Sequence, residues 1–140
     1  MNYIKKSCII NVDCIIIIKN KKVLVVRKKT KENFPEFIIP GGKRETGETD
    51  VETLQREIQE EVNLKVVKAE YVDEYEDIAI FEKVPIVVKA YLCEVEGEVN
   101  VDNEIKEFCW IDKDYKKNGI KVASILEKFV LPELIRRKLI

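Results

Sequence analysis

The segment between Gly42 and Leu64 constrains the fold of this chain most strongly, because it combines a helical apolar pattern with clustered acidic residues. When residues 49–63 are placed on a helix at about 100° per residue, their aliphatic side chains fall within one narrow arc. These side chains are Val51, Leu54, Ile58 and Val62. The pattern predicts a helix that packs one face against a core. Thr49 and Glu52 have the spacing of a capping box and predict where the helix begins.

Glu57, Glu60 and Glu61 are predicted on the other side of this helix, at positions i, i+3 and i+4. Like charges at that spacing destabilise a helix. A divalent cation that neutralises the carboxylates is therefore the simplest explanation for the cluster. The alternative is an acidic helix face exposed to solvent.

The same segment resembles the Nudix box, whose pattern is G-x5-E-x7-R-E-U-x-E-E-x-G-U, with U an aliphatic residue. The matching residues are Gly42, Glu48, Arg56, Glu57, Ile58, Glu60, Glu61 and Leu64. Asn63 stands where the family has Gly. Because Asn tolerates the left-handed conformation better than most residues, we expect it to end the helix at a small cost in stability.

The resemblance extends to Pro40-Gly41-Gly42-Lys43 and to the region of Trp110. It implies an α/β (α+β) fold, the Nudix α/β/α sandwich with a mixed β-sheet between helices. A chain of 140 residues fits one domain, so we expect a single Nudix hydrolase domain over residues 1–140.

Composition excludes several kinds of site. The chain has no histidine, which removes histidine-type zinc sites and Ser-His or Cys-His nucleophile systems. Carboxylates, carbonyls and substrate oxygens must then hold any metal, which favours Mg²⁺ or Mn²⁺. The net charge of −1 offers no global basic field to polymeric nucleic acid. No apolar run reaches the roughly 18 residues that span a membrane.

The cysteines form no CxxC pair and lie in apolar, strand-like runs, which predicts reduced thiols and a cytoplasmic protein. They are Cys8, Cys14, Cys93 and Cys109. Strands are predicted at 8–18, 23–26, 37–39, 65–73, 77–83, 85–93 and 107–111, with a turn at 19–22. A break is expected at Pro40-Gly41-Gly42, and a last helix at 121–140 that Pro132 kinks or restarts.

The resemblance implies roles for the residues of the box. Glu57, Glu60 and Glu61 match the metal ligands, and a carbonyl of the Gly41–Gly42 turn, assigned to Gly42, adds a further ligand. Glu48 and Arg56 match the pair that joins the loop to the helix. An ordinary surface ion pair is the alternative for these two residues.

Outside the box, Glu104 is the first candidate for a further acidic residue of the site, and Glu107 is the second. The general base is Glu57, Glu60 or Glu104, or no single side chain, because a metal itself lowers the pKa of water.

Arg27, Lys28, Gly41 and Lys43 are the candidate substrate-binding residues, although a solvated basic loop explains the cations equally well. Phe37 and Tyr91 are candidates for stacking on a base, although aromatic residues of strands more often belong to the core.

The resemblance implies hydrolysis of a nucleoside diphosphate linked to another group. The short, MutT-like type favours nucleoside triphosphates, (d)NTPs or oxidised dNTPs, which give a monophosphate and pyrophosphate. ADP-ribose or nucleotide sugars are the alternative substrates; members that act on ADP-ribose tend to carry an extra N-terminal stretch. Two alternatives are not enzymes of this family. One is a Nudix module that binds nucleotides without turnover, and the other is an unrelated domain with an acidic helix. We expect a small-molecule nucleotide as the partner and no membrane, and a homodimer remains open.

Overall fold

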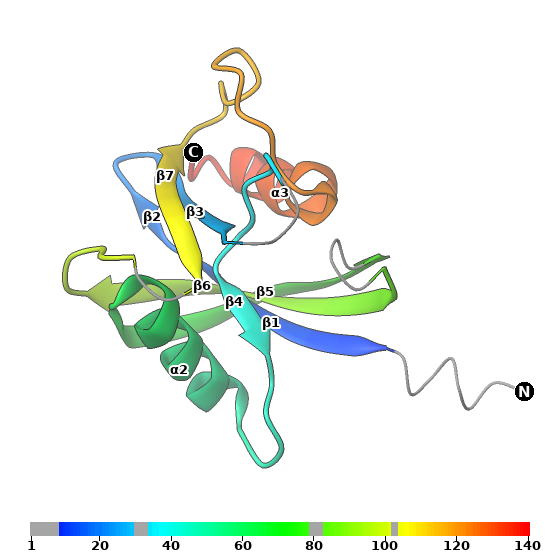
Figure 1. Cartoon of the computed structure of the whole chain (residues 1–140). Coiled ribbons are helices and arrows are strands. Elements are labelled where there is room, and N and C mark those ends of the chain that lie inside the picture. The colour runs from blue at the N-terminus through cyan, green and yellow to red at the C-terminus, as the bar shows by residue number, and fades with distance from the viewer. Residues whose placement is uncertain (1–8, 30–33, 79–82, 102–103) are drawn as a thin grey trace, which may run out of the picture.

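A computed structural model describes residues 9–29, 34–78, 83–101 and 104–140. Parts of the predicted strands at 8–18 and 77–83, together with Cys8, lie outside these residues. The described elements form two sheets and a set of helical segments (Figure 1). The strands are β1 Ile10–Ile16, β2 Ile18–Lys19, β3 Lys22–Lys28, β4 Gly41–Lys43, β5 Lys65–Ile78, β6 Pro85–Glu96 and β7 Ile105–Ile111. The helical segments are α2 Asp50–Val62, η1 Leu126–Val130 and α3 Leu131–Arg136.

The larger sheet is mixed and has the strand order β4-β1-β6-β5, with β1 parallel to β6 and the other pairs antiparallel. The smaller sheet has the order β2-β3-β7 and is antiparallel. β1 and β2 are consecutive in the chain but belong to different sheets, so this stretch joins the two sheets. The predicted turn at 19–22 is confirmed: Asn20 and Lys21 both have positive φ, as a tight two-residue hairpin requires.

The ends of α2 form as the sequence predicts. Thr49 and Glu52 make both hydrogen bonds of a capping box. Asn63 ends the helix in the left-handed conformation, with φ 58° and ψ 41°. The family glycine is thus replaced by a residue that adopts the same backbone shape.

The predicted faces of α2 need two corrections. Leu54, Ile58 and Val62 are buried, but Val51 is 59% exposed. The first turn of α2 faces the sheet through Asp50, which contacts Arg44 and Tyr91 and leaves Val51 turned outward. Glu61 was predicted on the solvent side with the other acids, yet it is only 7% exposed. Seven residues turn a helix by nearly two full turns, so Glu61 lies beside the line of Leu54.

Several strand predictions also change. The predicted gap between the strands at 65–73 and 77–83 does not exist, because β5 runs without interruption from Lys65 to Ile78 at the edge of the larger sheet. Most of its acidic side chains are exposed, and Asp77 accepts a hydrogen bond from Ser124. The predicted strand 37–39 makes only isolated bridges at Phe37 and Ile38. The predicted break at Gly41–Gly42 instead belongs to β4, because β1 supplies a partner for its backbone groups.

The last helical segment begins at Ser124, later than predicted, and changes from a π-turn in η1 to an α-helix in α3. Pro132 lies in the first turn of α3, where its missing N–H costs least. The backbone stays helical from Ser124 through Leu131, so Pro132 does not restart the helix, and the turn before it widens to a π-helix instead. No helix in the described part of the chain is long and apolar enough to cross a bilayer.

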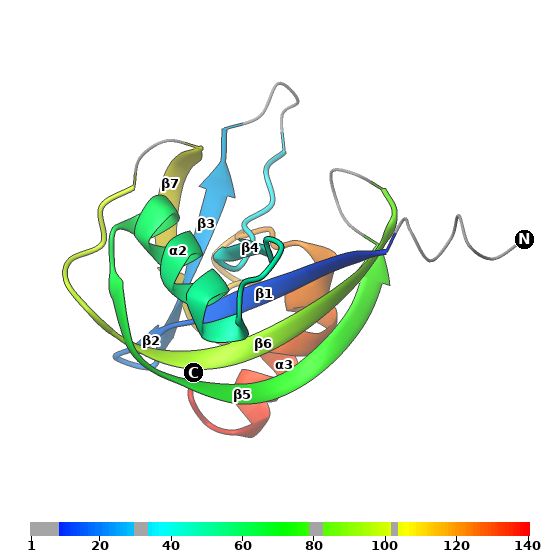
Figure 2. The ribbon, with the colours of Figure 1, turned by 90° about the horizontal axis from the view of Figure 1, so that it is seen from below.

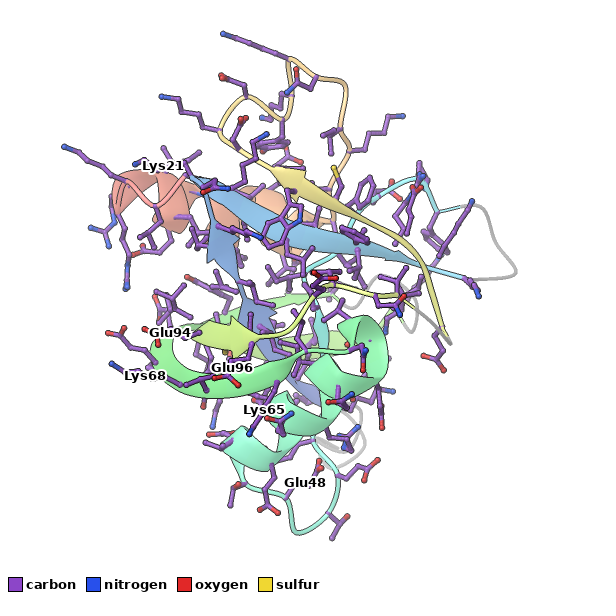
Figure 3. The ribbon with its side chains drawn as sticks, turned by 90° about the vertical axis from the view of Figure 1, so that its left-hand side faces the viewer. Lys21, Glu48, Lys65, Lys68, Glu94 and Glu96 are labelled. Carbon is purple, nitrogen blue, oxygen red and sulfur yellow. The ribbon has the colours of Figure 1, made fainter. Side chains whose placement is uncertain are left out.

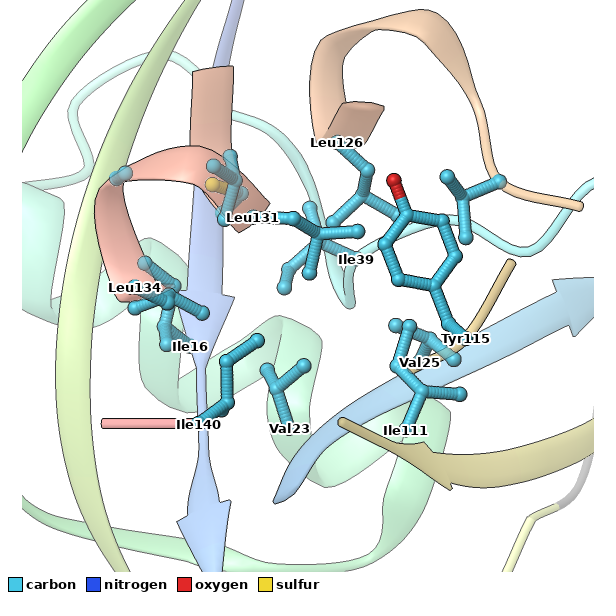
Figure 4. Packing of buried hydrophobic residues seen from close by; sticks show 14 of the residues in the cluster. Ile16, Val23, Val25, Ile39, Ile111, Tyr115, Leu126, Leu131, Leu134 and Ile140 are labelled. Carbon is cyan, nitrogen blue, oxygen red and sulfur yellow. The ribbon is translucent and has the colours of Figure 1, made fainter. Parts of the chain in front are cut away.

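The helices pack on opposite sides of the strands, as Figures 1 and 2 show for α2 and α3. One core cluster includes Ile15, Leu54, Ile58 and Val62 beneath α2. The other joins the C-terminal segment to both sheets, and Figure 4 shows Leu126, Leu131, Leu134 and Ile140 against Ile16, Val23 and Val25. The predicted α/β/α sandwich is confirmed. Among the described cysteines, Cys14 and Cys93 are buried, Cys109 is half-buried, and all are free thiols.

Candidate active site

Two glycines of β4 form one side of the site. A Cβ on Gly42 would lie 2.4 Å from Cδ and Oε1 of Glu57, so glycine is what lets this carboxylate pack on the strand. Gly41 has φ 148° and lies so close to β1 that a Cβ would be 2.3 Å from the Asp13 carbonyl oxygen. Its N–H donates a hydrogen bond to Glu61 Oε2 at 3.0 Å. The glycines therefore bring the α2 carboxylates directly against a backbone edge.

Glu61 carries an unsatisfied buried oxygen. Its Oε1 has no hydrogen-bond partner, whereas Oε2 accepts from Gly41. Burial raises the pKa of this carboxyl, the charge of Lys28 opposes that shift, and the neighbouring Glu57 adds to it. A buried carboxylate oxygen without a partner is costly, and a cation beside it would remove that cost.

Arg56 connects the loop before α2 to the helix. Its Nε lies 2.7 Å from Glu48 Oε2, and its Nη2 donates to Glu48 Oε1 at 2.9 Å and to the Lys43 carbonyl oxygen at 3.0 Å. Its Nη1 donates to Glu57 Oε1 at 2.7 Å. The hydrogen bonds from Arg56 are the main reason why the pKa of Glu48 falls to about 2. Glu48 lies in the loop that leads into α2 (Figure 3).

A cavity of about 720 Å³ opens beside this network. Its polar wall contains most of the candidate residues, namely Lys28, Gly41, Gly42, Lys43, Arg56, Glu57, Glu60, Glu61 and Glu104. Lys28 and Glu104 meet because β3 and β7 pair there, and the Lys29 N–H donates to the Glu104 carbonyl oxygen at 2.6 Å. Residues far apart in the sequence thus converge on one cavity.

Arg27 and Glu107 are not among the residues that line the cavity. They pair with each other, and the Arg27 guanidinium lies 4.8 Å from the centre of the Phe37 ring. Because successive strand residues face opposite sides, Lys28 reaches the cavity while Arg27 does not. Of the two acidic candidates before Trp110, only Glu104 lies at the site.

The cavity also has an apolar lining, which the sequence analysis did not anticipate. It contains Ile10, Val12, Cys14, Ile39, Ile78, Ile86, Val88, Ala123 and Ile125, with Ser124 beside them. Val12 lies next to Val88 in the parallel pair of β1 and β6, and alternate residues at the start of each strand line the cavity. That alternation was the available signal, but it does not reveal which face has a helix and which a cavity. Glu45 also lines the polar wall and was not predicted.

Neither aromatic candidate lines the cavity. Phe37 packs under Arg27, and Tyr91 contacts Tyr71 edge-on and donates a hydrogen bond to Asp50 Oδ2 at 2.6 Å. Both are structural in this fold.

The donor set suits a hard divalent cation. Carboxylates and carbonyls are the ligands that Mg²⁺ and Mn²⁺ prefer, and Glu61 Oε1 is a buried acceptor still to be satisfied. No compact group of three acidic, cysteine or histidine ligands is already assembled among the residues described. Glu60 is 55% exposed, with its Oε2 at 3.6 Å from Arg56 Nη1. Glu57 is a helix neighbour of both Glu60, at i+3, and Glu61, at i+4.

The chain is thus an α/β sandwich in which glutamates and glycine backbone line a cavity, and these groups suit a divalent metal ion. The family model of the NUDIX domain matches residues 9–120, and the chain belongs to the Nudix family. It is accordingly a Nudix pyrophosphohydrolase, which hydrolyses nucleoside diphosphates linked to another group. No curated protein matches the chain.

Solved structures share the fold. A Nudix hydrolase from Nitrosomonas europaea is 15% identical with a TM-score of 0.76, over 93% of this chain and 90% of the other. A MutT protein from Bacillus halodurans is 24% identical with a TM-score of 0.69, over 88% and 80%. A bifunctional NMN adenylyltransferase/ADP ribose pyrophosphatase from Francisella tularensis is 16% identical with a TM-score of 0.71, over 92% of this chain and 41% of the other.

Proposed function

We propose that this protein hydrolyses nucleoside triphosphates, (d)NTPs or their oxidised forms, to a monophosphate and pyrophosphate. The observation that carries the proposal is one cavity whose lining combines the box glutamates and two lysines with aliphatic side chains. The charged side chains suit a metal-bound polyphosphate, and the aliphatic side chains suit the face of a base. In the reaction, water forms a new P–O bond, a bridging P–O bond breaks, and the phosphate-bearing group leaves.

We assign the metal to Glu57, Glu60 and Glu61 together with the carbonyl of Gly42. When bound, Mg²⁺ or Mn²⁺ would neutralise phosphate oxygens and lower the pKa of the attacking water. Gly42 and Arg56 hold Glu57 in place, and Glu48 in turn fixes Arg56. Such partners orient the groups that contact a metal.

Lys28 and Lys43 are the proposed phosphate-binding cations, because both line the cavity and Lys28 acts electrostatically on Glu61. The Gly41 N–H already donates a hydrogen bond to Glu61. We therefore propose that this glycine contributes to the site by letting the backbone of β4 lie close to β1. We do not assign Arg27 to substrate binding, because it forms an ion pair with Glu107 and packs over the Phe37 ring.

Glu104 lines the cavity from the turn just before β7 and is our candidate for a further ligand or for the general base. Glu57 and Glu60 remain candidates for the base. Glu57 Oε1 already accepts a hydrogen bond from Arg56.

We propose a single Nudix hydrolase domain over residues 1–140 and a cytoplasmic location. The family match and the packing of α3 on the shared core support a single domain. The free thiols support a cytoplasmic location. The oligomeric state, a homodimer included, is to be measured by light scattering.

The test is product analysis with Mg²⁺ on canonical dNTPs, 8-oxo-dGTP, ADP-ribose, a nucleotide sugar, NADH and a diadenosine polyphosphate, with EDTA controls. Monophosphate plus pyrophosphate supports the proposal. Cleavage of ADP-ribose or a sugar nucleotide alone would replace it with the alternative substrate class. Mn²⁺ binding without any turnover would identify a nucleotide-binding module.

The variant Glu60→Gln tests whether Glu60 is a metal ligand or only part of an acidic helix face. We expect turnover to fall by at least about 100-fold with the fold intact, because Glu60 is exposed and makes no core contact. Glu94→Gln, on β6 and outside the cavity, is the matched control and should keep wild-type turnover. Near-normal activity of Glu60→Gln would remove Glu60 from the ligand set.

A further inference from the structure

A second charged cluster lies beneath the first turn of α2, outside the cavity. It consists of Asp13 on β1, Arg44 after β4, Asp50 at the start of α2, and Tyr91 on β6. Asp13 and Ile15 face the same side of β1 because strand residues alternate, and Ile15 packs in the core under α2. Asp13 is therefore enclosed between the sheet and the helix, where it is only 2% exposed.

Arg44 is the cation at the centre of this cluster. Its Nη2 lies 3.4 Å from both Oδ1 and Oδ2 of Asp13, and it forms an ion pair with Asp50. Tyr91 donates its hydroxyl hydrogen to Asp50 Oδ2 at 2.6 Å. One guanidinium thus connects the middle of the sheet to the first residue of the helix.

The position of Arg44 in the chain links this cluster to the active site. Lys43 precedes it, and the Lys43 carbonyl oxygen accepts from Arg56 at 3.0 Å. The end of β4 is therefore held by Arg56 on one side and by Arg44 on the other. Gly42, one residue earlier, is the surface on which the Glu57 carboxylate packs.

We propose that Arg44 is a positioning residue, which sets the distance between β4 and α2 and so aligns Glu57 and Glu61 with the Gly41–Gly42 backbone. Arg44, Asp13, Asp50 and Tyr91 do not line the cavity, so they act on the site through the backbone that they hold. The inference rests on the proposed function only for its effect on turnover. Its effect on metal affinity is independent of the substrate.

The experiment measures Mn²⁺ affinity, kcat, KM and thermal unfolding for Arg44→Met and for Asp13→Asn/Arg44→Met. Arg44→Met removes the guanidinium beside the buried Asp13 carboxylate and leaves Lys89 as the other nearby cation, and we expect a lower melting temperature. Asp13→Asn removes that charge, so the double variant should regain stability. We expect Mn²⁺ affinity and kcat to stay about 10- to 100-fold below wild type in both variants, with a smaller change in KM.

Arg136→Met is the matched control, because Arg136 pairs with Glu133 on α3, outside the cavity, and should keep wild-type Mn²⁺ affinity. Recovery of Mn²⁺ affinity together with stability in the double variant would reduce Arg44 to a purely structural role and overturn the proposal. Unchanged affinity in Arg44→Met would do the same. If Arg44→Met fails to fold, the double variant alone decides the question. Wild-type protein that binds Mn²⁺ without cleaving nucleotides would refute the proposed function and leave this inference testable.

Discussion

Gly42→Ala is the sharpest test of how the site is built. The added Cβ would lie 2.4 Å from Cδ of Glu57, whereas ordinary contacts begin near 3.4 Å. The carboxylate must therefore move by about 1 Å. The backbone of Gly42 is outside the left-handed region, so alanine causes no conformational strain there. Because only the end of a flexible side chain has to yield, we expect the fold to survive.

A displacement of about 1 Å at a reacting centre costs about 100-fold in rate, which corresponds to about 2.7 kcal/mol of transition-state stabilisation. We therefore expect kcat to fall by about that factor, and Mn²⁺ affinity to fall with it. The assay is steady-state hydrolysis of the best substrate, alongside Mn²⁺ titration and circular dichroism of the unfolding transition.

Gly119→Ala is the matched control for this prediction. Gly119 has φ 72° with open space around its Cα, so alanine there should lower stability through backbone strain and leave kcat unchanged. A Gly42→Ala variant whose kcat stays within about threefold of wild type would refute the argument that Glu57 needs this surface.

Further predictions concern α2 and its loop. Thr49→Ala removes the capping hydrogen bond to the Glu52 N–H and should lower the free energy of unfolding by about 1 kcal/mol, measured by denaturant titration. Asn63→Ala should cost about 1 kcal/mol in the same assay, because Ala tolerates φ 58° poorly, and Asn63→Gly should not. The pKa of Glu48 is lowered from 4.5 to about 2, so its stabilising effect is complete above about pH 4.5 and is lost as the pH falls towards 2. Glu48→Gln should therefore show a shallower loss of melting temperature across that window, and an unchanged slope would contradict the assigned pairing with Arg56.

Features of α2 were predictable because they depend on neighbours in the chain. The capping box, the left-handed Asn63 and the buried Leu54, Ile58 and Val62 all follow from short-range spacing. The exceptions on this helix are Val51 and Glu61. The helical period itself places Glu61 beside Leu54, whereas the exposure of Val51 depends on how the first turn packs on the sheet, which the period does not contain.

The strands were harder to predict because their partners are distant in sequence. Gly41–Lys43 has the composition of a turn, yet it forms β4 since β1 supplies the hydrogen bonds. The acidic stretch of β5 has the composition of a loop, yet it pairs along its length with β6. In both cases long-range pairing overrides local preference.

The sequence by itself determined the family and the acidic helix, because both depend on spacing within one short segment, and it showed that no histidine is available to a metal. Only the tertiary structure decided that Lys28 and Glu104 share a cavity while Arg27 and Glu107 do not, since the pairing of β3 with β7 sets which residues face it. It also placed Arg44 between Asp13 and Asp50. Such contacts exist only once strands and helix have packed, because each joins residues that no local rule brings together.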